Sequence, residues 1–157
     1  MSKNKGFSLV EIVVVIAIMA VLVGVLAPVF VRYIEKSKQG ADLQNLDSAV
    51  DVLEAYFSDK DFTDGSTAVT VTLTLGSPLQ TSGVPAGFDP EQNLVDMGII
   101  SAKGDALPLK ANKWSASGIG NSTVPSVVYD IQSNHKTYTG ESEYFKANDA
   151  GTSIDAK

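Results

Sequence analysis

Glu11 is an acidic residue inside the apolar N-terminal part of the chain, and its carboxylate is the first group that could take part in chemistry. On a helix, the residues one turn before and one turn after it are Phe7 and Val15, and neither is basic. An ionised carboxylate within a bilayer costs a few kcal/mol. Glu11 therefore needs a positive partner from another segment or another molecule.

Hydrolysis of the peptide bond between Gly6 and Phe7 would create such a partner. The new N-terminus would be an α-ammonium group on Phe7, four residues from Glu11 in the same chain and equally available to Glu11 of a neighbouring chain. In an alternative interpretation, Glu11 lies at the membrane surface, where it reaches the lipid headgroups and the helix dipole stabilises its charge. That alternative explains why the charge is tolerated, but it gives the charge no partner in a protein assembly.

The element that carries Glu11 continues as an uncharged apolar segment from Ile12 to Val31. Twenty residues at about 1.5 Å each form a helix that spans the ~30 Å hydrocarbon core of a bilayer. Lys3 and Lys5 precede the segment. The positive-inside rule therefore predicts a cytoplasmic N-terminus and places the residues after Arg32 outside the membrane.

Three interpretations are compatible with such a segment. A cleaved secretory signal normally has an apolar core of about 7–15 residues and a cleavage site of small residues. Here the core is longer, and the exit at Ala27 is followed by Pro28, which is a poor context for cleavage. The second interpretation is a permanent membrane anchor, and the third is a membrane span that later enters an assembly. Glu11 favours the third, because an assembly can give its charge a partner.

The residues from Lys5 to Glu11 read Lys-Gly-Phe-Ser-Leu-Val-Glu. Together with the apolar segment they closely resemble the class III signal of type IV prepilins. The resemblance implies that a membrane aspartyl prepilin peptidase removes residues 1–6 by cutting between Gly6 and Phe7, and then N-methylates Phe7. It also implies that Glu11 neutralises the N-terminal ammonium group of an adjacent subunit during assembly.

The resemblance covers roughly residues 3–38 and extends to Pro28. Many pilins have a proline at this position, and in several of them the helix is locally unwound around it in the filament. Proline also removes a helix hydrogen bond, and Gly24 is a weak helix former. We therefore expect a kink or local melting at Gly24 and Pro28. The expected organisation is a leader at 1–6, a hydrophobic transmembrane helix at 7–31 and an extracellular globular domain at 32–157.

The function implied by the resemblance is that of a structural subunit of a type IV pilus. Such a subunit polymerises through its N-terminal helix into an extracellular filament used for adhesion, aggregation or twitching motility. Its implied partners are further copies of the chain, the prepilin peptidase, the pilus assembly ATPase and the inner-membrane platform. The prepilin would cross the cytoplasmic membrane once before it joins the pilus on the cell surface. Two alternatives stay open: a pseudopilin of a type II secretion or competence system, and a membrane-anchored binding domain that never polymerises.

Composition disfavours enzymatic sites and nucleic-acid binding. The 157 residues include no Cys and one His, which excludes disulfides, thiolate metal sites and Cys nucleophiles. The formal net charge is −6, and an acidic chain binds phosphate groups poorly. His135 lies in a polar segment that predicts a solvated turn. We expect no catalytic residue, no cofactor, no metal site and no nucleic-acid partner.

An acidic loop contains Asp59, Asp61 and Asp64 and invites comparison with a calcium site. A calcium loop of the EF-hand type would need an acid or amide at Thr63 and a Glu near Thr70, and both are missing. We expect a solvated loop, and weak calcium binding there stays an open alternative.

The helix is expected to run from about Phe7 to Ser58, apolar all round in its first half and amphipathic in its second. The apolar stripe of the second half is spaced by three and four residues, as in a helix face packed on a core. The stripe consists of Leu43, Leu46, Val50, Leu53 and Phe57, and the acids expected on the solvent side are Asp42, Asp47, Asp51 and Glu54.

The remaining residues predict an antiparallel sheet that covers this stripe. Alternating Val, Leu and Thr predict a strand over 69–75. Asp89-Pro90-Glu91 predicts a short helix that ends at Gly98 and packs Leu94, Val95, Met97, Ile99 and Ile100 on the long helix. Further strands are expected at 106–115, 126–132 and 136–139, with a turn at 133–135, a possible edge at 144–145 and a mobile tail at 149–157. Trp114 is expected to be a core or interface anchor. The predicted fold class is α+β, with a long N-terminal helix against a C-terminal antiparallel sheet, as in the pilin ladle fold.

Overall fold

A computed structural model describes residues 8–58, 68–111, 114 and 123–157 of the chain. The predicted cleavage junction at Gly6 and Phe7 and the acidic loop with Asp59, Asp61 and Asp64 lie outside the described residues. The chain divides into two compact units, which comprise residues 1–35 and residues 36–157.

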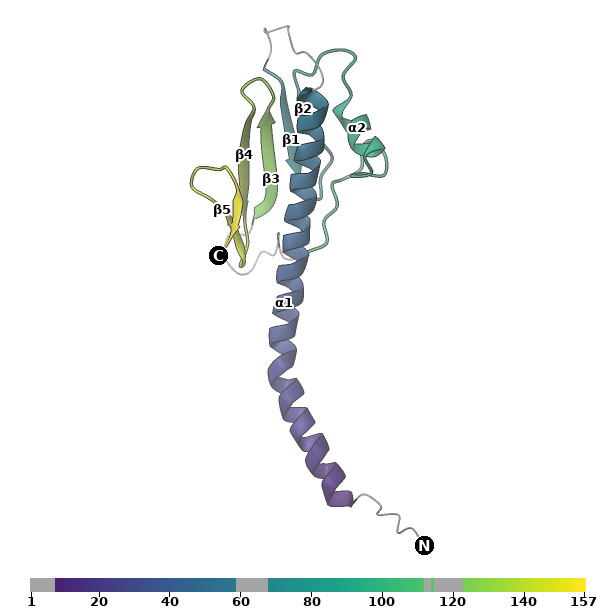
Figure 1. Cartoon of the computed structure of the whole chain (residues 1–157), viewed down its shortest axis with the longest axis vertical. Coiled ribbons are helices and arrows are strands. Elements are labelled where there is room, and N and C mark those ends of the chain that lie inside the picture. Colours follow the sequence, from purple (N-terminus) through teal and green to yellow (C-terminus); the bar gives the residue numbers. More distant parts are fainter. Residues whose placement is uncertain (1–7, 59–67, 112–113, 115–122) are drawn as a thin grey trace. The chain divides into compact units, whose positions relative to one another are not determined.

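Helix α1 spans Leu9–Ser58 and has 50 residues, which confirms the predicted long helix (Figure 1). Its first turn begins at Ser8, whose carbonyl oxygen accepts hydrogen bonds from the backbone N–H groups of Glu11 and Ile12 at 3.0 and 3.3 Å. The helix continues through Gly24 and Pro28 without interruption. Melting around these two residues in a filament stays a prediction.

The unit of residues 36–157 contains an antiparallel sheet beside the second part of α1 (Figure 1). Within the described residues the sheet has six strands in the order β2-β1-β3-β4-β5-β6. The strands are β1 (Thr70–Thr74), β2 (Gln80–Ser82), β3 (Thr123–Asp130), β4 (His135–Glu141), β5 (Phe145–Ala147) and β6 (Ile154–Ala156). The α+β class predicted from the sequence is therefore confirmed.

The core of this unit forms between the apolar stripe of α1 and the inner face of β1 and β3. In β1 the side chains of Val71 and Leu73 are buried between partly exposed threonines, as the alternation in sequence predicted. Two inward residues of β3, Val127 and Tyr129, extend the same layer. The residues of α1 that join this core are Leu46, Ala49, Val50, Leu53 and Phe57.

Strands β3 and β4 form a hairpin whose turn precedes His135, so His135 is the exposed first residue of β4. Asn134 has a φ of 50° and supplies the left-handed residue of this turn. Gly140 is buried on β4, with a φ of 146°. A Cβ atom there would lie 2.9 Å from the Cα atom of Pro125, so the two strands could not approach this closely with a larger residue.

Helix α2 spans Pro90–Asp96 and confirms the predicted short helix. The Asp89 side chain accepts a hydrogen bond from the backbone N–H of Gln92 at 2.9 Å, which caps the helix N-terminus. Leu94 and Ile100 are buried as predicted, but Met97 is 62% exposed. The prediction for Met97 was wrong because this residue ends α2 on the side that faces solvent.

Three further predictions about the C-terminal region were wrong. Residues 149–157 are not a mobile tail, since β6 pairs with β5 and forms the sheet edge that was expected at 144–145. Within 106–111 the structure has a single bridge, Leu107 to Leu75, in place of a strand. A short edge strand, β2, also pairs with β1 where no strand was predicted. These short edges carry little of the apolar alternation by which strands are recognised in a sequence.

Asp42 was predicted on the solvent side of α1, but it is fully buried. Its carboxylate accepts hydrogen bonds from the backbone N–H groups of Lys110 and Ala111 at 2.7 and 2.9 Å, and from Trp114 Nε1 at 3.1 Å. Trp114 is itself fully buried, which confirms its core role. One turn earlier, buried Gln39 accepts a hydrogen bond from Ser142 Oγ at 2.7 Å. These polar contacts tie two loop segments to the helix.

We expect Asp42→Asn to destabilise the folded chain by about 2–3 kcal/mol, because an amide offers one acceptor oxygen where three donors converge and hydrogen bonds to charged groups contribute about 1.5–3 kcal/mol each. Trp114 is the chain's single tryptophan, so its fluorescence reports directly on this contact. Thermal unfolding of the full chain in detergent should show a lower Tm and red-shifted emission. The control, Asp149→Asn in an exposed turn, should change neither. Unchanged emission and Tm in Asp42→Asn would contradict the assigned role.

Candidate functional site

Glu11 lies in the first turn of α1, and its side chain is exposed. Among the described residues it takes part in none of the ion pairs. A carboxylate in the first turn is favoured by the helix dipole. Ser8 and Glu11 also have the Ser-x-x-Glu spacing of a capping box, in which a Glu or Gln side chain can bond a backbone N–H at the helix start. Glu11 is therefore placed to satisfy its own helix start or to meet a cation from outside the chain.

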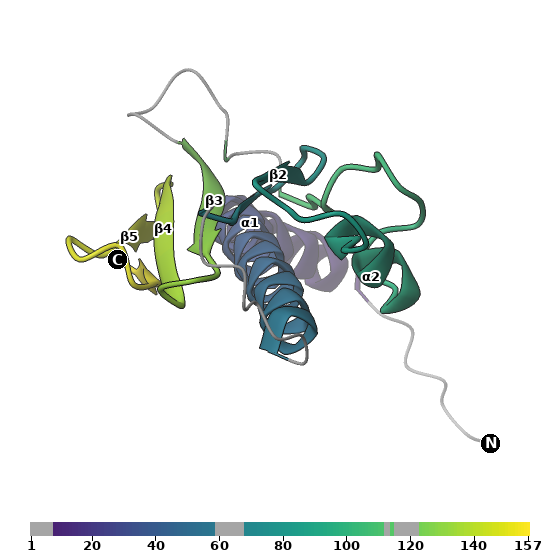
Figure 2. The same ribbon diagram turned by 90° about the horizontal axis from the view of Figure 1, so that it is seen from above.

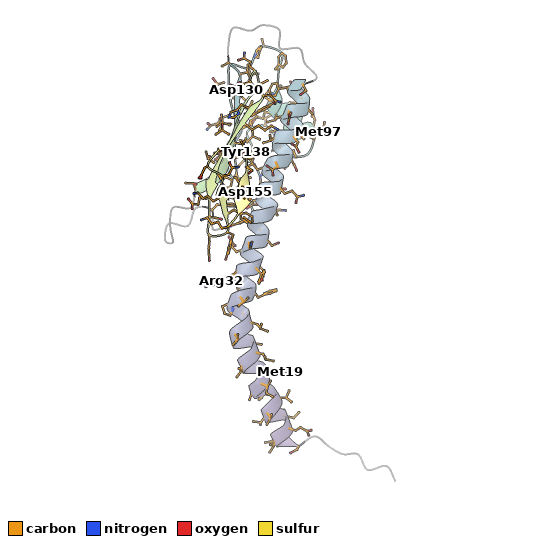
Figure 3. The ribbon with its side chains drawn as sticks, turned by 60° about the vertical axis from the view of Figure 1, so that its left-hand side comes forward. Met19, Arg32, Met97, Asp130, Tyr138 and Asp155 are labelled. Atoms are coloured by element: carbon orange, nitrogen blue, oxygen red, sulfur yellow. The ribbon has the colours of Figure 1, made fainter. Side chains whose placement is uncertain are left out.

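The apolar side chains around the first half of α1 have no partner within the described residues. Those of the large apolar residues from Leu9 to Ile34 are at least 41% exposed. The apolar segment of α1 has no buried part, and α1 is long and apolar enough to cross a membrane. Figure 3 shows Met19 and Arg32 on this part of α1, projecting away from the ribbon. An apolar surface of this extent is abnormal for a soluble monomer and marks a surface that lipid or protein covers.

A polar cluster lies between α1 and β4 in the unit of residues 36–157, at a cavity of about 220 Å³ lined in part by Asp47, Asp51 and Tyr138. Tyr138 is labelled on the sheet in Figure 3. Burial raises the pKa of Asp47, and the Asp51 carboxylate raises it further, while a hydrogen bond from Tyr138 and the charge of Lys136 act in the opposite direction. Burial and the nearby Asp47 carboxylate raise the pKa of Tyr138 to about 12. Lys136 forms an ion pair with Glu54.

The described part of the chain contains no group of three or more His, Asp or Glu side chains that could hold a metal ion. His135 is exposed, and no hydrogen bond of its side chain to a nucleophile is present among the described residues. Among the described residues, the exposed apolar surface of α1 is the feature that supports recognition of another surface.

The predicted site residues that the structure describes are distributed along α1 and do not gather in a pocket. Glu11 lies in the first turn, Gly24 and Pro28 lie in the helix interior, and Gly6 and Phe7 lie outside the described residues. Sequence reasoning missed the buried role of Asp42. Its position four residues before Leu46, on the apolar stripe, was the available signal.

Two comparisons with known proteins bear on this helix. Residues 1–27 match the family described as "Prokaryotic N-terminal methylation motif". Among curated proteins, the "Type IV major pilin protein PilA" of Myxococcus xanthus (strain DK1622) is 34% identical over 59 residues, which cover 38% of this chain and 27% of that protein. The matched segment is thus about a quarter of the relative's length. No solved structure matches the chain.

The fold of the chain is consistent with these similarities. A methylation motif stands at the start of an exposed apolar helix, and that helix is followed by an antiparallel sheet. Both similarities cover part of the chain: the methylation motif covers residues 1–27, and the similarity to the major pilin covers 59 residues.

Proposed function

We propose that this chain is a structural subunit of an extracellular type IV pilus and polymerises through α1. The observation that carries the proposal is the apolar first half of α1, whose side chains are exposed along its whole length. A surface of this kind is stable in a bilayer or in a bundle of identical helices, and a pilus subunit uses both in turn.

In the first state the chain spans the cytoplasmic membrane once, with its N-terminus in the cytoplasm and residues 32–157 outside. Lys3 and Lys5 before the apolar helix support this orientation. Prepilin peptidase then hydrolyses the Gly6–Phe7 bond with one water molecule, which leaves a carboxylate on Gly6 and an ammonium group on Phe7. The Phe7 nitrogen, after losing a proton, takes a methyl group from a separate sulfonium methyl donor, which leaves as the thioether. Residues 1–6 are the leader, and residues 7–31 are the span.

In the second state the helices leave the lipid and pack together. This transfer gains little hydrophobic free energy, because lipid tails are as apolar as the side chains of the bundle. Polar contacts therefore have a large influence on how the subunits align. Glu11 supplies the carboxylate, and the Phe7 ammonium group of an adjacent subunit supplies the cation. A pair of this type is strong in an apolar environment because both charges are poorly solvated.

The assembly ATPase and the inner-membrane platform are the further partners of this proposal, and the filament serves adhesion, aggregation or twitching motility on the cell surface. The relative from Myxococcus xanthus is named as a major pilin, which favours an abundant subunit here as well. In a pseudopilin, the same processed chain would stay in the membrane fraction.

We expect Gly6→Val to block removal of residues 1–6, because a peptidase must approach the backbone closely at the residue before the cut and glycine permits this. Electrophoresis and mass analysis of the membrane fraction should show an uncut chain. The matched control is Gly24→Ala, where a Cβ atom meets nothing within 4 Å, and it should be processed normally. Normal processing of Gly6→Val would refute the predicted junction.

We expect Glu11→Gln and Glu11→Ala to be cleaved normally but to reduce the yield of sheared filaments at least about tenfold, since a lost charge-assisted hydrogen bond of 1.5–3 kcal/mol corresponds to roughly that factor or more. Glutamine can still serve in a capping box, whereas alanine cannot. Equal loss in both variants supports the charge pair. Normal filaments from Glu11→Gln together with loss in Glu11→Ala would show that Glu11 acts as a helix cap.

A further inference from the structure

The two flanks of α1 in the unit of residues 36–157 carry opposite charges. At about 100° per residue, Lys38 lies about 180° around the helix from Asp47 and about 140° from Asp51. Asp47 lies on the flank of β4, because it accepts a hydrogen bond from Tyr138. Lys110 lies at a cavity that it shares with Asn45, which is two turns along α1 from Lys38 and on the same side. We call Asp47 and Asp51 the acidic flank, and Lys38 and Lys110 the basic flank.

The two flanks look outward on different sides of the unit. Figures 1 and 2 agree that β4 and α2 lie on opposite sides of α1. Asp47 belongs to the β4 side, where it lines one cavity with Asp51 and Tyr138, and Asp51 also lines a second cavity with Asn93 and Met97 at α2. The basic flank belongs to the other side, where Gly98 and Ile99, just after α2, line the cavity with Lys110. One neighbouring molecule on each side would therefore meet a different charge.

The acidic flank is not neutralised by the residues that the structure describes. Asp47 and Asp51 are four residues apart on a helix, where like charges repel. The nearby cation, Lys136, already forms an ion pair with Glu54, so three carboxylates share one ammonium group. The raised pKa of Asp47 has the same origin, since burial and Asp51 both disfavour its charged form. A cation from a second molecule would stabilise this flank.

The basic flank is also without an ionic partner. Among the described residues, neither Lys38 nor Lys110 forms an ion pair. Asp42 accepts a hydrogen bond from the backbone N–H of Lys110. Asp42 is fully buried and also holds Ala111 and Trp114, so it is not available to a side chain at the surface.

We propose that the basic flank of one subunit binds the acidic flank of the next copy, and this inference rests on the proposed function as a filament subunit. Two parallel helices related mainly by a translation meet through opposite flanks, and a shift of nine residues, about 14 Å, brings Lys38 level with Asp47. A contact between two different surfaces of the same chain does not close on itself as a two-fold dimer does. Repeated, it produces an open filament.

A charge swap in the producing cells tests the contact. Asp47→Lys should reduce the yield of sheared filaments at least about fivefold, because an attraction becomes a repulsion in every repeat. Adding Lys38→Asp should restore the yield to within about twofold of the original chain. The matched control adds Lys36→Asp instead, which makes the same charge change about 20° from Asp47 on the same side of α1, and it should not restore filaments.

A second measurement needs no variant. Sheared filaments of the original chain are treated with a carbodiimide, which joins an amine to a carboxylate in direct contact, and the linked peptides are identified by mass spectrometry. Links from Lys38 or Lys110 to Asp47 or Asp51 support the proposed contact between the flanks. The two flanks of one helix cannot reach each other, so such a link must join two copies. An unchanged filament yield in Asp47→Lys, or crosslinks that come from Lys36, would overturn the proposed contact between the flanks. Either result would leave the proposed pilus function intact. Absence of any filament from the original chain would refute both the proposed function and the proposed contact between the flanks.

Discussion

The apolar side chains in the first half of α1 cannot bury one another, and the other properties of the molecule follow from this. Its apolar side chains surround the helix, and no part of its most apolar membrane-length segment is buried. Water is therefore a poor environment for this segment, and the chain must exist in lipid or against other chains. Glu11 lies near the start of this segment and makes its two ends different, because the carboxylate attracts a cation to the N-terminal end.

The second half of the same helix has the opposite property, since it finds its partners within the chain. Leu46, Leu53 and Phe57 pack against β1 and β3, and buried Asp42 and Gln39 hold two loop segments to α1 by hydrogen bonds. The sequence contains no Cys, so these hydrogen bonds hold the loop segments without a disulfide. The unit of residues 36–157 thus has its own core.

Much of this organisation could be predicted from the sequence because it rests on local patterns. The helix to Ser58, the strand around Val71 and the capped helix at Pro90 follow from periodicity, alternation and capping. The burial of Asp42 could not be predicted, because its hydrogen-bond donors lie about 70 residues away in the chain. The same holds for β6, whose pairing depends on the sheet that precedes it. The charge difference between the flanks also required knowing which side of α1 faces β4.

Intact-mass and N-terminal analysis of the protein decides whether the apolar half of α1 passes from the membrane into a filament after cleavage before Phe7. Material sheared from the cell surface is compared with the membrane fraction. The account predicts chains that begin at N-methylated Phe7 in long sheared filaments. Chains that still begin at Met1 or Ser2, or processed chains confined to the membrane fraction, would contradict it.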